Sequence, residues 1–265
     1  MARLLMCRPE HFDVSYVINP WMVGEVGQVN KKLAEKQWES LFMELSHFAK
    51  IDLIEQVSGL PDMVFTANAG LVHKNIFFPS NFRHDQRKGE EEHFTKFFAD
   101  KNYEIRKLTN WFEGEGDFLS SRIDPNFYFA GSGFRSLLNA LPLVSSLDEN
   151  FYQYFSLFLV DYRFYHLDTC FCPINKTTAL FYPRAFAEES IALIKFFYPN
   201  AIEVSEKDAL AFACNAIVLD RHVFLPYNND VSTILEEKGF VVHEFDVSEF
   251  LKAGGGPKCL CLTID

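Results

Sequence analysis

A five-fold repetition constrains the fold of this chain more than any other feature of its sequence. Small or polar residues lead into short apolar segments five times, with markers at Asn68, Asp117, Asp168, Asn215 and Cys259. Successive markers are separated by 49, 51, 47 and 44 residues, close to one fifth of the 265-residue chain. Repetition at this period indicates a supersecondary unit that buries its apolar face against its neighbours.

Each of the first four markers opens a predicted β-hairpin. A turn rich in Asn, Asp or basic residues follows the first strand, and a second apolar strand follows the turn. The second strands are expected at residues 76–78, 127–129, 179–182 and 223–225. Between hairpins, apolar residues recur at helical spacing, most clearly at residues 31–48 and 185–197.

The strand that follows Cys259 is expected to pair with residues 3–7, which closes a ring and removes exposed edges. The pattern therefore favours one closed α/β assembly of about five ββα-type units, with residues 1–265 as a single domain, over two separate domains. The acidic triplet at residues 90–92 is expected to be a solvated helix start.

The composition excludes several function classes. A formal net charge of −11 argues against sequence-independent binding of nucleic acid or binding of anionic lipid, and it favours a small cationic ligand. The 29 Phe residues predict a strongly aromatic core. No signal-peptide run and no apolar stretch of about 20 residues is present, so a cytoplasmic location is expected. The six Cys are dispersed and are expected to be reduced.

In a closed ring of repeats, residues from distant parts of the chain meet near the central axis. The polar residues expected there are Asp62, Asn68, Glu113, Asp117, His166, Asp168 and Cys259. This set holds one nucleophile, one base and several carboxylates. Carboxylates gathered in a partly buried cleft need a cationic partner, which in so acidic a chain points to a cationic substrate.

Two interpretations of Cys259 are open at this point. The glycine-rich stretch 254–256 before it permits close approach of a ligand, which favours a nucleophilic thiolate. Alternatively, Cys259 is a buried strand residue like Cys261, which is expected to share its face. His166 is either a hydrogen-bonded core residue or the proton shuttle for Cys259, and Asp168 is expected on the same side of one strand as His166.

The segment at residues 113–117, Glu-Gly-Glu-Gly-Asp, is not a phosphate loop, because its carboxylates repel phosphate and no Gly-Lys-Ser/Thr element follows. It is either a polar turn or a cation-binding rim. Neither His-rich nor EF-hand spacing occurs, so no metal is expected.

These residues give the sequence a resemblance to the guanidino-group-modifying enzymes, the superfamily of dimethylarginine dimethylaminohydrolase, arginine deiminase, arginine dihydrolase and the amidinotransferases. The similarity runs from residues 7–9 and 19–22 to residues 254–259. It implies a five-bladed α/β propeller, the pentein fold, built from ββαβ-type units with pseudo-five-fold symmetry. That expectation agrees with the repeat.

The same resemblance implies roles for individual residues. Cys259 is expected to attack the guanidinium carbon, His166 to act as general acid and base, and Glu113 to hold the guanidinium and orient the site. Five further positions are expected to bind substrate, with the two arginines at its carboxylate end: Asp62, Asn68, Asp168, Arg87 and Arg135.

Three departures from the family pattern bear on specificity. Asn68, in Phe-Thr-Ala-Asn, stands where many hydrolases of the superfamily have Asp. The Phe-Thr-Ala-Asn variant resembles that of arginine dihydrolases, which continue past citrulline to ornithine. The extra residue in Glu-Gly-Glu-Gly-Asp leaves Glu113 and Glu115 as alternatives for the functional acid. His-Leu-Asp at residues 166–168 resembles arginine-processing members, whereas many dimethylarginine hydrolases lack the Asp.

The leading hypothesis is a cofactor-independent hydrolase that cleaves the guanidino C–N bond of free arginine or a methylated arginine. A covalent thiouronium on Cys259 would yield citrulline or ornithine, with release of ammonia or methylamines. The alternatives are an amidinotransferase, which delivers the amidino group to an amine, and a non-catalytic pentein-fold binding protein. The expected partner is a small guanidino substrate, with no nucleic acid and no membrane, and a homodimer stays open.

Overall fold

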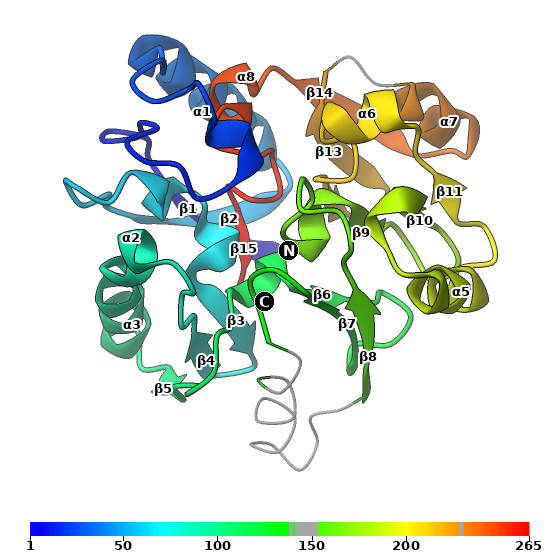
Figure 1. Ribbon diagram of the computed structural model, residues 1–265, viewed down its shortest axis with the longest axis horizontal. Coiled ribbons are helices and arrows are strands. Elements are labelled where there is room, and N and C mark those ends of the chain that lie inside the picture. The colour runs from blue at the N-terminus through cyan, green and yellow to red at the C-terminus, as the bar shows by residue number, and fades with distance from the viewer. Residues whose placement is uncertain (138–139, 141–152, 228–229, 265) are drawn as a thin grey trace.

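The computed structural model describes residues 1–137, 140, 153–227 and 230–264. Within these ranges the strands form five three-stranded sheets arranged around a central axis, and the longer helices cover the outside of the ring (Figure 1). The prediction of a five-bladed α/β propeller is therefore confirmed.

Every sheet follows the same plan, in which the first two strands are antiparallel and the third runs parallel to the second. Four sheets are continuous in sequence: β3 (Gly70–His73), β4 (Ile76–Pro79) and β5 (Glu104–Ile105); β6 (Phe118–Ser120), β7 (Phe127–Ser132) and β8 (Gln153–Phe158); β9 (Phe171–Pro173), β10 (Ala179–Phe181) and β11 (Ile202–Glu203); β12 (Ile217–Leu219), β13 (His222–Pro226) and β14 (Val241–Phe245). The fifth combines distant segments: β15 (Leu262–Thr263), β1 (Ala2–Cys7) and β2 (Ala49–Ile54).

Among the described residues, the longer helices between the second and third strands of a sheet are α1 (Lys31–Leu45), α3 (Glu90–Asp100), α5 (Glu188–Phe197) and α7 (Val231–Glu237). Shorter helices are α2 (Asp85–Lys88), α6 (Glu206–Leu210) and α8 (Ser248–Leu251). None of the helices in the described part of the chain is long and apolar enough to cross a membrane.

All four predicted hairpins are present, and the predicted ring closure is confirmed. Strand β15 pairs antiparallel with β1, with Leu4 opposite Thr263 and Leu5 opposite Leu262. The ring therefore closes by pairing residues more than 250 positions apart, which supplies hydrogen-bond partners to both strands.

Several element boundaries differ from those expected. The helix expected over residues 31–48 ends at Leu45, and residues 49–54 enter β2. The helix expected over residues 185–197 begins at Glu188, because Pro183–Ala185 form the 3-10 turn η7 and Ala187 is extended, with ψ of 154°. Two of the third strands, β5 and β11, lack a clear sequence signal because they comprise only two residues each.

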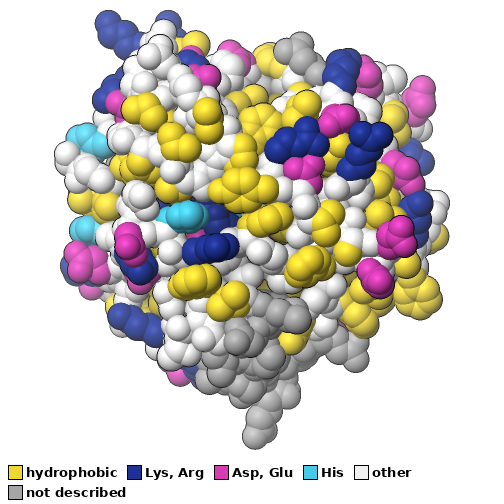
Figure 2. Space-filling view, viewed as in Figure 1, with side chains coloured by type: hydrophobic (Ala, Val, Ile, Leu, Met, Phe, Trp, Pro, Cys, Tyr) yellow, Lys and Arg dark blue, Asp and Glu magenta, His cyan; other side chains and the backbone are white. Residues whose placement is uncertain are grey.

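The predicted aromatic core is present. Phe77 of β4 stacks on Phe98 of α3, with ring centroids 3.9 Å apart. On the other side of the ring Phe129 contacts Phe171 and Tyr198, which joins the sheets of neighbouring blades. On the face seen in Figure 1, Lys, Arg and His side chains gather near the centre with hydrophobic side chains around them (Figure 2).

Near the axis, Thr66 ties three segments together. Its fully buried hydroxyl shares its proton between the carbonyl oxygens of Leu5 (2.8 Å) and Leu260 (3.0 Å), and it accepts the N–H of Leu262 (3.2 Å). Thr66 opens the 3-10 turn η3 (Thr66–Ala69), which carries Asn68. One hydroxyl therefore fixes this turn against β1 and against the segment that follows Cys259.

Replacing Thr66 with Val, which has a similar shape, removes these hydrogen bonds and leaves buried backbone groups without a partner. We expect Thr66→Val to lower the free energy of unfolding by about 1–3 kcal/mol, measured by urea denaturation. The matched control is Thr177→Val at an exposed turn, with an expected change within about 0.5 kcal/mol. Equal effects of the two substitutions would contradict this account of the axis.

Candidate active site

Tight turns near the axis, rather than strands, carry the marker residues. Three of these are 3-10 turns: η3 with Asn68, η4 (Gly114–Gly116) between Glu113 and Asp117, and η6 (Leu167–Thr169) with Asp168. Strands β3, β6 and β9 begin directly after them. The turns therefore deliver polar side chains to the axis, and the strands behind them provide the packing.

Two expectations about strand faces are wrong for this reason. His166 precedes η6 and Asp168 lies within it, so the two side chains do not alternate as in a strand. Cys259 lies in a turn closed by the hydrogen bond from Leu260 N–H to the carbonyl of Pro257, and β15 begins only at Leu262.

The thiol of Cys259 is buried between two polar partners. It is 3% exposed, and its Sγ lies 3.4 Å from Asp168 Oδ2, to which the S–H donates. On another side, Asn215 Nδ2 donates to Sγ over 3.1 Å. The structure thus brings together residues that precede three different sheets: Asp168 before β9, Asn215 before β12 and Cys259 before β15. The side-chain partners of Cys259 distinguish it from a core cysteine surrounded by apolar side chains.

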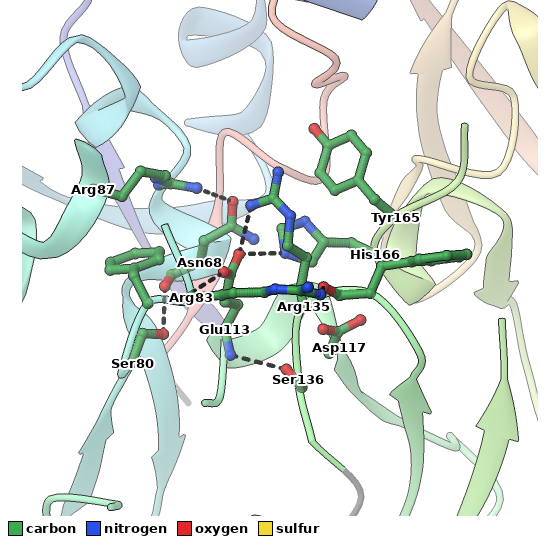
Figure 3. Close-up of polar contacts among 12 residues, drawn as sticks. Asn68, Ser80, Arg83, Arg87, Glu113, Asp117, Arg135, Ser136, Tyr165 and His166 are labelled. Carbon is green, nitrogen blue, oxygen red and sulfur yellow. Dashed lines mark hydrogen bonds and ion pairs between the residues drawn. The ribbon is translucent and has the colours of Figure 1, made fainter. Parts of the chain in front are cut away.

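Glu113 is the centre of a second group (Figure 3). Its Oε2 lies 2.8 Å from His166 Nε2 and 3.0 Å from Arg135 Nη1, and its Oε1 accepts the backbone N–H of Arg83. The backbone N–H of Glu113 in turn donates to Ser136 Oγ (2.9 Å). The carboxylate is fully buried, so these contacts compensate its desolvation.

The third group surrounds Arg87, whose guanidinium is almost fully buried. It forms a two-pronged ion pair with Glu90 (2.9 and 2.8 Å) and donates to Asn68 Oδ1 (2.9 Å) and to the backbone carbonyl of Asp62 (3.1 Å). The carboxylate of Asp62 accepts the hydroxyl of Tyr16 (3.0 Å). The expectation that residues 90–92 are a solvated helix start is therefore wrong for Glu90, which is fully buried as the counter-ion of Arg87.

The two candidate acids of the Glu-Gly-Glu-Gly-Asp segment lie in different environments. Glu113 contacts His166, whereas Glu115 accepts from Lys258 Nζ (2.7 Å) and from the backbone N–H of Thr263 (2.9 Å). Gly114 lies between them with φ of +62°, a left-handed conformation that suits glycine, and this bend turns the two carboxylates to different partners.

A small cavity of about 10 Å³ lies among these groups and is lined by Asp62, Asn68, Arg87, Arg135 and Cys259, together with Tyr165 and residues 254–255. An amino acid does not fit in this volume, so ligand binding requires side chains to move apart. A larger cavity of about 420 Å³ is lined by Asp168 and Lys258 but not by Cys259, and His166 is not among the lining residues of either cavity. We place the site at the smaller cavity because the candidate nucleophile faces it.

Burial sets the protonation of the site, and ion pairs modify it. Burial raises the pKa of Asp168 to about 7, although Lys258 and hydrogen bonds from the thiol and Asn215 favour its ionised form. Burial also raises the pKa of the Cys259 thiol well above its usual value, and Asp168 adds to this effect. Burial works in the same direction on Glu113, but Arg135 and the hydrogen bond to His166 outweigh it and lower its pKa. A bound cation would favour ionisation of both Asp168 and Cys259.

Two residues of the site, Tyr16 and Asn215, were not predicted from the sequence. Tyr16 lies in an irregular segment without a motif, so nothing in the sequence pointed to it. Asn215 was one of the five repeat markers, so a signal was present and was not assigned a role.

Comparison with known proteins finds similarity to one enzyme family over almost the whole chain. A family model described as "N,N dimethylarginine dimethylhydrolase, eukaryotic" matches residues 19–264. The bifunctional arginine dihydrolase/ornithine cyclodeaminase ArgZ of Synechocystis sp. is 43% identical over 99% of this chain, which spans 37% of that relative's length. The dimethylarginine dimethylaminohydrolase of Mycobacterium tuberculosis is 36% identical over 99% of this chain and 85% of its own length.

Solved structures agree. The N-terminal domain of ArgZ with product bound superimposes with a TM-score of 0.96 at 41% identity, covering 100% of this chain and 97% of that one. An Asn-to-Ser variant of that domain is covalently bound to a reaction intermediate. A dimethylarginine dimethylaminohydrolase adduct, at 18% identity and a TM-score of 0.80, shows the shared fold. The chain therefore belongs to the dimethylarginine dimethylaminohydrolase family of the guanidino-group-modifying superfamily, whose fold is the pentein propeller.

Proposed function

We propose that this chain is a hydrolase that cleaves the guanidino C–N bond of free arginine or a methylated arginine through a covalent adduct on Cys259. The observation that carries the proposal is the arrangement around the small cavity. Cys259, whose buried thiol is hydrogen-bonded to Asp168, lines this cavity together with Asp62 and Arg135, and Arg135 is ion-paired with Glu113, the partner of His166. Its relatives named as arginine dihydrolases and dimethylarginine dimethylaminohydrolase support this substrate class.

Unpartnered polar atoms in the site match a guanidinium. Asp62 Oδ1 and Asp168 Oδ1 are both buried and accept no hydrogen bond within the described residues. A guanidinium is planar and offers five N–H donors, so two carboxylates on different sides satisfy it and neutralise its charge. We assign Asp62 and Asp168 to the guanidinium for this reason.

The reaction follows from these positions. The bound guanidinium favours loss of the Cys259 proton, which passes to His166, and the thiolate attacks the guanidinium carbon. The resulting tetrahedral centre expels one nitrogen, which takes that proton from His166 and leaves as ammonia or a methylamine. The carbon is then held as a thiouronium on sulfur. His166 removes a proton from water, the oxygen attacks the same carbon, and the C–S bond breaks to regenerate the thiolate and release the ureido product.

Glu113, rather than Glu115, serves this chemistry in our proposal. A carboxylate hydrogen-bonded to His166 fixes the orientation of the ring for proton transfer. Glu115 is instead held by the ammonium of Lys258 (2.7 Å). It is therefore a structural partner of the turn that carries Cys259, residues 256–260, which we call the nucleophile turn.

We assign Arg87 and Arg135 to the carboxylate end of the substrate. Arg135 Nε is buried and has no hydrogen-bond partner within the described residues, so it retains donor capacity. Its Nη atoms donate to Glu113 and to the carbonyl of Ile18 (3.0 Å). Arg87 is more fully engaged, so its part in binding requires exchange of a present partner.

Loss of the nucleophile tests the proposal most directly. Incubation with arginine and with dimethylarginine, followed by mass spectrometry, is expected to show citrulline or ornithine with ammonia or methylamines. Cys259→Ser should reduce turnover at least about 1,000-fold, because serine is not activated here as a nucleophile. The matched control is Cys261→Ala, with activity within a few-fold of the unsubstituted protein.

Two outcomes would favour the alternative functions. Amidino transfer predicts that glycine or another amine acceptor is required for turnover. A binding protein predicts no product from either substrate, and no difference between Cys259→Ala and the unsubstituted protein in activity or thiol labelling.

Binding of arginine should depend on pH through Asp168. Its carboxylate must be ionised to hold a guanidinium, and its pKa is about 7 in the folded protein. In the Cys259→Ser background, the dissociation constant for arginine measured by calorimetry should rise up to about 10-fold per unit as the pH falls below 7. Adding Asp168→Asn should remove most of this dependence, and an unchanged pH profile would refute the assignment.

The product of the reaction depends, in our proposal, on Asn68. Its buried Nδ2 has no hydrogen-bond acceptor within the described residues and can donate to the ureido oxygen of bound citrulline, which an Asp cannot do. We therefore propose ornithine as the product from arginine. The thiolate of Cys259 attacks the ureido carbon of bound citrulline and a second ammonia leaves, water then breaks the C–S bond, and the resulting carbamate loses CO2 to give ornithine. Asn68→Asp should make citrulline accumulate and reduce ornithine about 10-fold or more, as measured by mass spectrometry of products. An unchanged ornithine fraction, or citrulline alone from the unsubstituted enzyme, would contradict this role.

A further inference from the structure

The side chain of Asn215 makes four hydrogen bonds, all directed to the nucleophile turn or to its neighbour η6. Its Oδ1 accepts the backbone N–H groups of Gly256 (3.1 Å) and Cys259 (3.2 Å). Its Nδ2 donates to Cys259 Sγ (3.1 Å) and to the backbone carbonyl of Asp168 (3.1 Å). The residue is fully buried, so all of its polar capacity is used inside the protein.

The surrounding backbone is shaped to this amide. A Cβ on Gly256 would lie 2.8 Å from Asn215 Oδ1, so a side chain at that position would displace the amide. The backbone of Asn215 is itself fixed, because its N–H donates to the carbonyl of Phe212 (2.9 Å) and its carbonyl accepts the N–H of Lys258 (3.3 Å). The amide therefore has one position and one set of partners.

The orientation of the amide follows from its partners. Two backbone N–H groups face one of its terminal atoms, and only the carbonyl oxygen accepts hydrogen bonds. The other terminal atom, which faces the sulfur and the carbonyl of Asp168, must then be the NH2 group. The sulfur of Cys259 is consequently the acceptor in its contact with Asn215, whereas it is the donor in its contact with Asp168.

We propose that Asn215 is a positioning residue that holds the sulfur of Cys259 as a hydrogen-bond acceptor and fixes the nucleophile turn at the same time. The proposal rests on the proposed function in taking Cys259 as the nucleophile. The two partners of the sulfur have opposite effects: Asp168 accepts the S–H and stabilises the thiol, and Asn215 donates an N–H and stabilises the thiolate. Asn215 thereby favours the reactive form without contacting the substrate.

The sign of one measurement separates this role from a purely structural one. Burial raises the pKa of the Cys259 thiol, so a variant that merely loosens the turn exposes the thiol, returns its pKa toward about 8.5 and speeds its alkylation. A variant that loses the N–H donor while the thiol stays buried slows alkylation instead. Asp168 and Tyr165 are titratable groups that interact with the thiol, and the charged groups of Asp62, Arg87 and Arg135 line the same small cavity. None of them is changed in the Asn215 variants.

The test is the rate of alkylation of Cys259 by iodoacetamide in the substrate-free protein, followed by mass spectrometry of the peptide between pH 7 and 10. Asn215→Asp keeps an oxygen for the two backbone N–H groups and loses the donor. Asn215→Ala loses the donor without adding a charge, and it decides the question if the Asp variant does not fold. Both should slow alkylation about 10-fold or more at pH 8.

Two controls accompany these variants. Cys214, adjacent to Asn215 and buried, should stay protected from the reagent if the fold is intact. Asp168→Asn, which removes the S–H acceptor and its charge, should speed alkylation of Cys259. Alkylation of Cys259 in both Asn215 variants at the original rate or faster overturns the proposal. Because the measurement uses no substrate, failure of the chain to hydrolyse arginine would refute the proposed function and leave this result standing.

Discussion

The main physical constraint on this structure is that several carboxylates near the propeller axis are removed from water. Asp62, Glu113 and Asp168 are all nearly or fully buried near the axis, where like charges repel strongly. Each is stabilised differently: Glu113 by Arg135 and His166, Asp62 by Tyr16, and Asp168 by the thiol of Cys259. The remaining acceptor capacity of Asp62 and Asp168 is what makes the site suited to a planar cation.

The propeller provides this arrangement because, after the third strand of each sheet, the chain returns to the axis and enters the next sheet through a tight turn. The turns η3, η4 and η6 and the turn at Cys259 each expose one or two side chains toward the centre. Hydrogen bonds between blades then fix the turns relative to one another. Thr66, which precedes β3, connects its turn to the segment before β15. Asn215, which precedes β12, connects to the turn of Cys259 before β15 and to η6 before β9.

The site in this structure is closed, and its electrostatics are consistent with substrate-assisted activation. The thiol is protonated and buried, and the acid beside it titrates near neutrality. A guanidinium that enters between Asp62 and Asp168 adds a positive charge next to the sulfur, which favours the thiolate. Reactivity would then appear only when the substrate is present, and the buried thiol is protected from other electrophiles until that time.

Much of the fold was predictable from sequence, because a period of about one fifth of the chain and four hairpin turns are local signals. The closing pair of β1 with β15 followed from the need to remove two exposed edges. The third strands β5 and β11 were not predictable from local patterns, since they are two residues long and are defined by their partners. The candidate nucleophile Cys259, the base His166 and the acid Glu113 could be identified from their residue types and motifs, with the choice between Glu113 and Glu115 open.

The sequence by itself determined the repeat, the ring and the chemical types of residue available at its centre, because these depend on spacing and composition along the chain. Only the tertiary structure decided which of these residues touch: that Glu113 pairs with His166, that Glu90 is buried against Arg87, and that the amide of Asn215 faces the sulfur. Such contacts join residues 3 to 53 positions apart through blades that pack around one axis. They are set by desolvation and hydrogen-bond matching in three dimensions, which leave no periodic trace in the order of the residues.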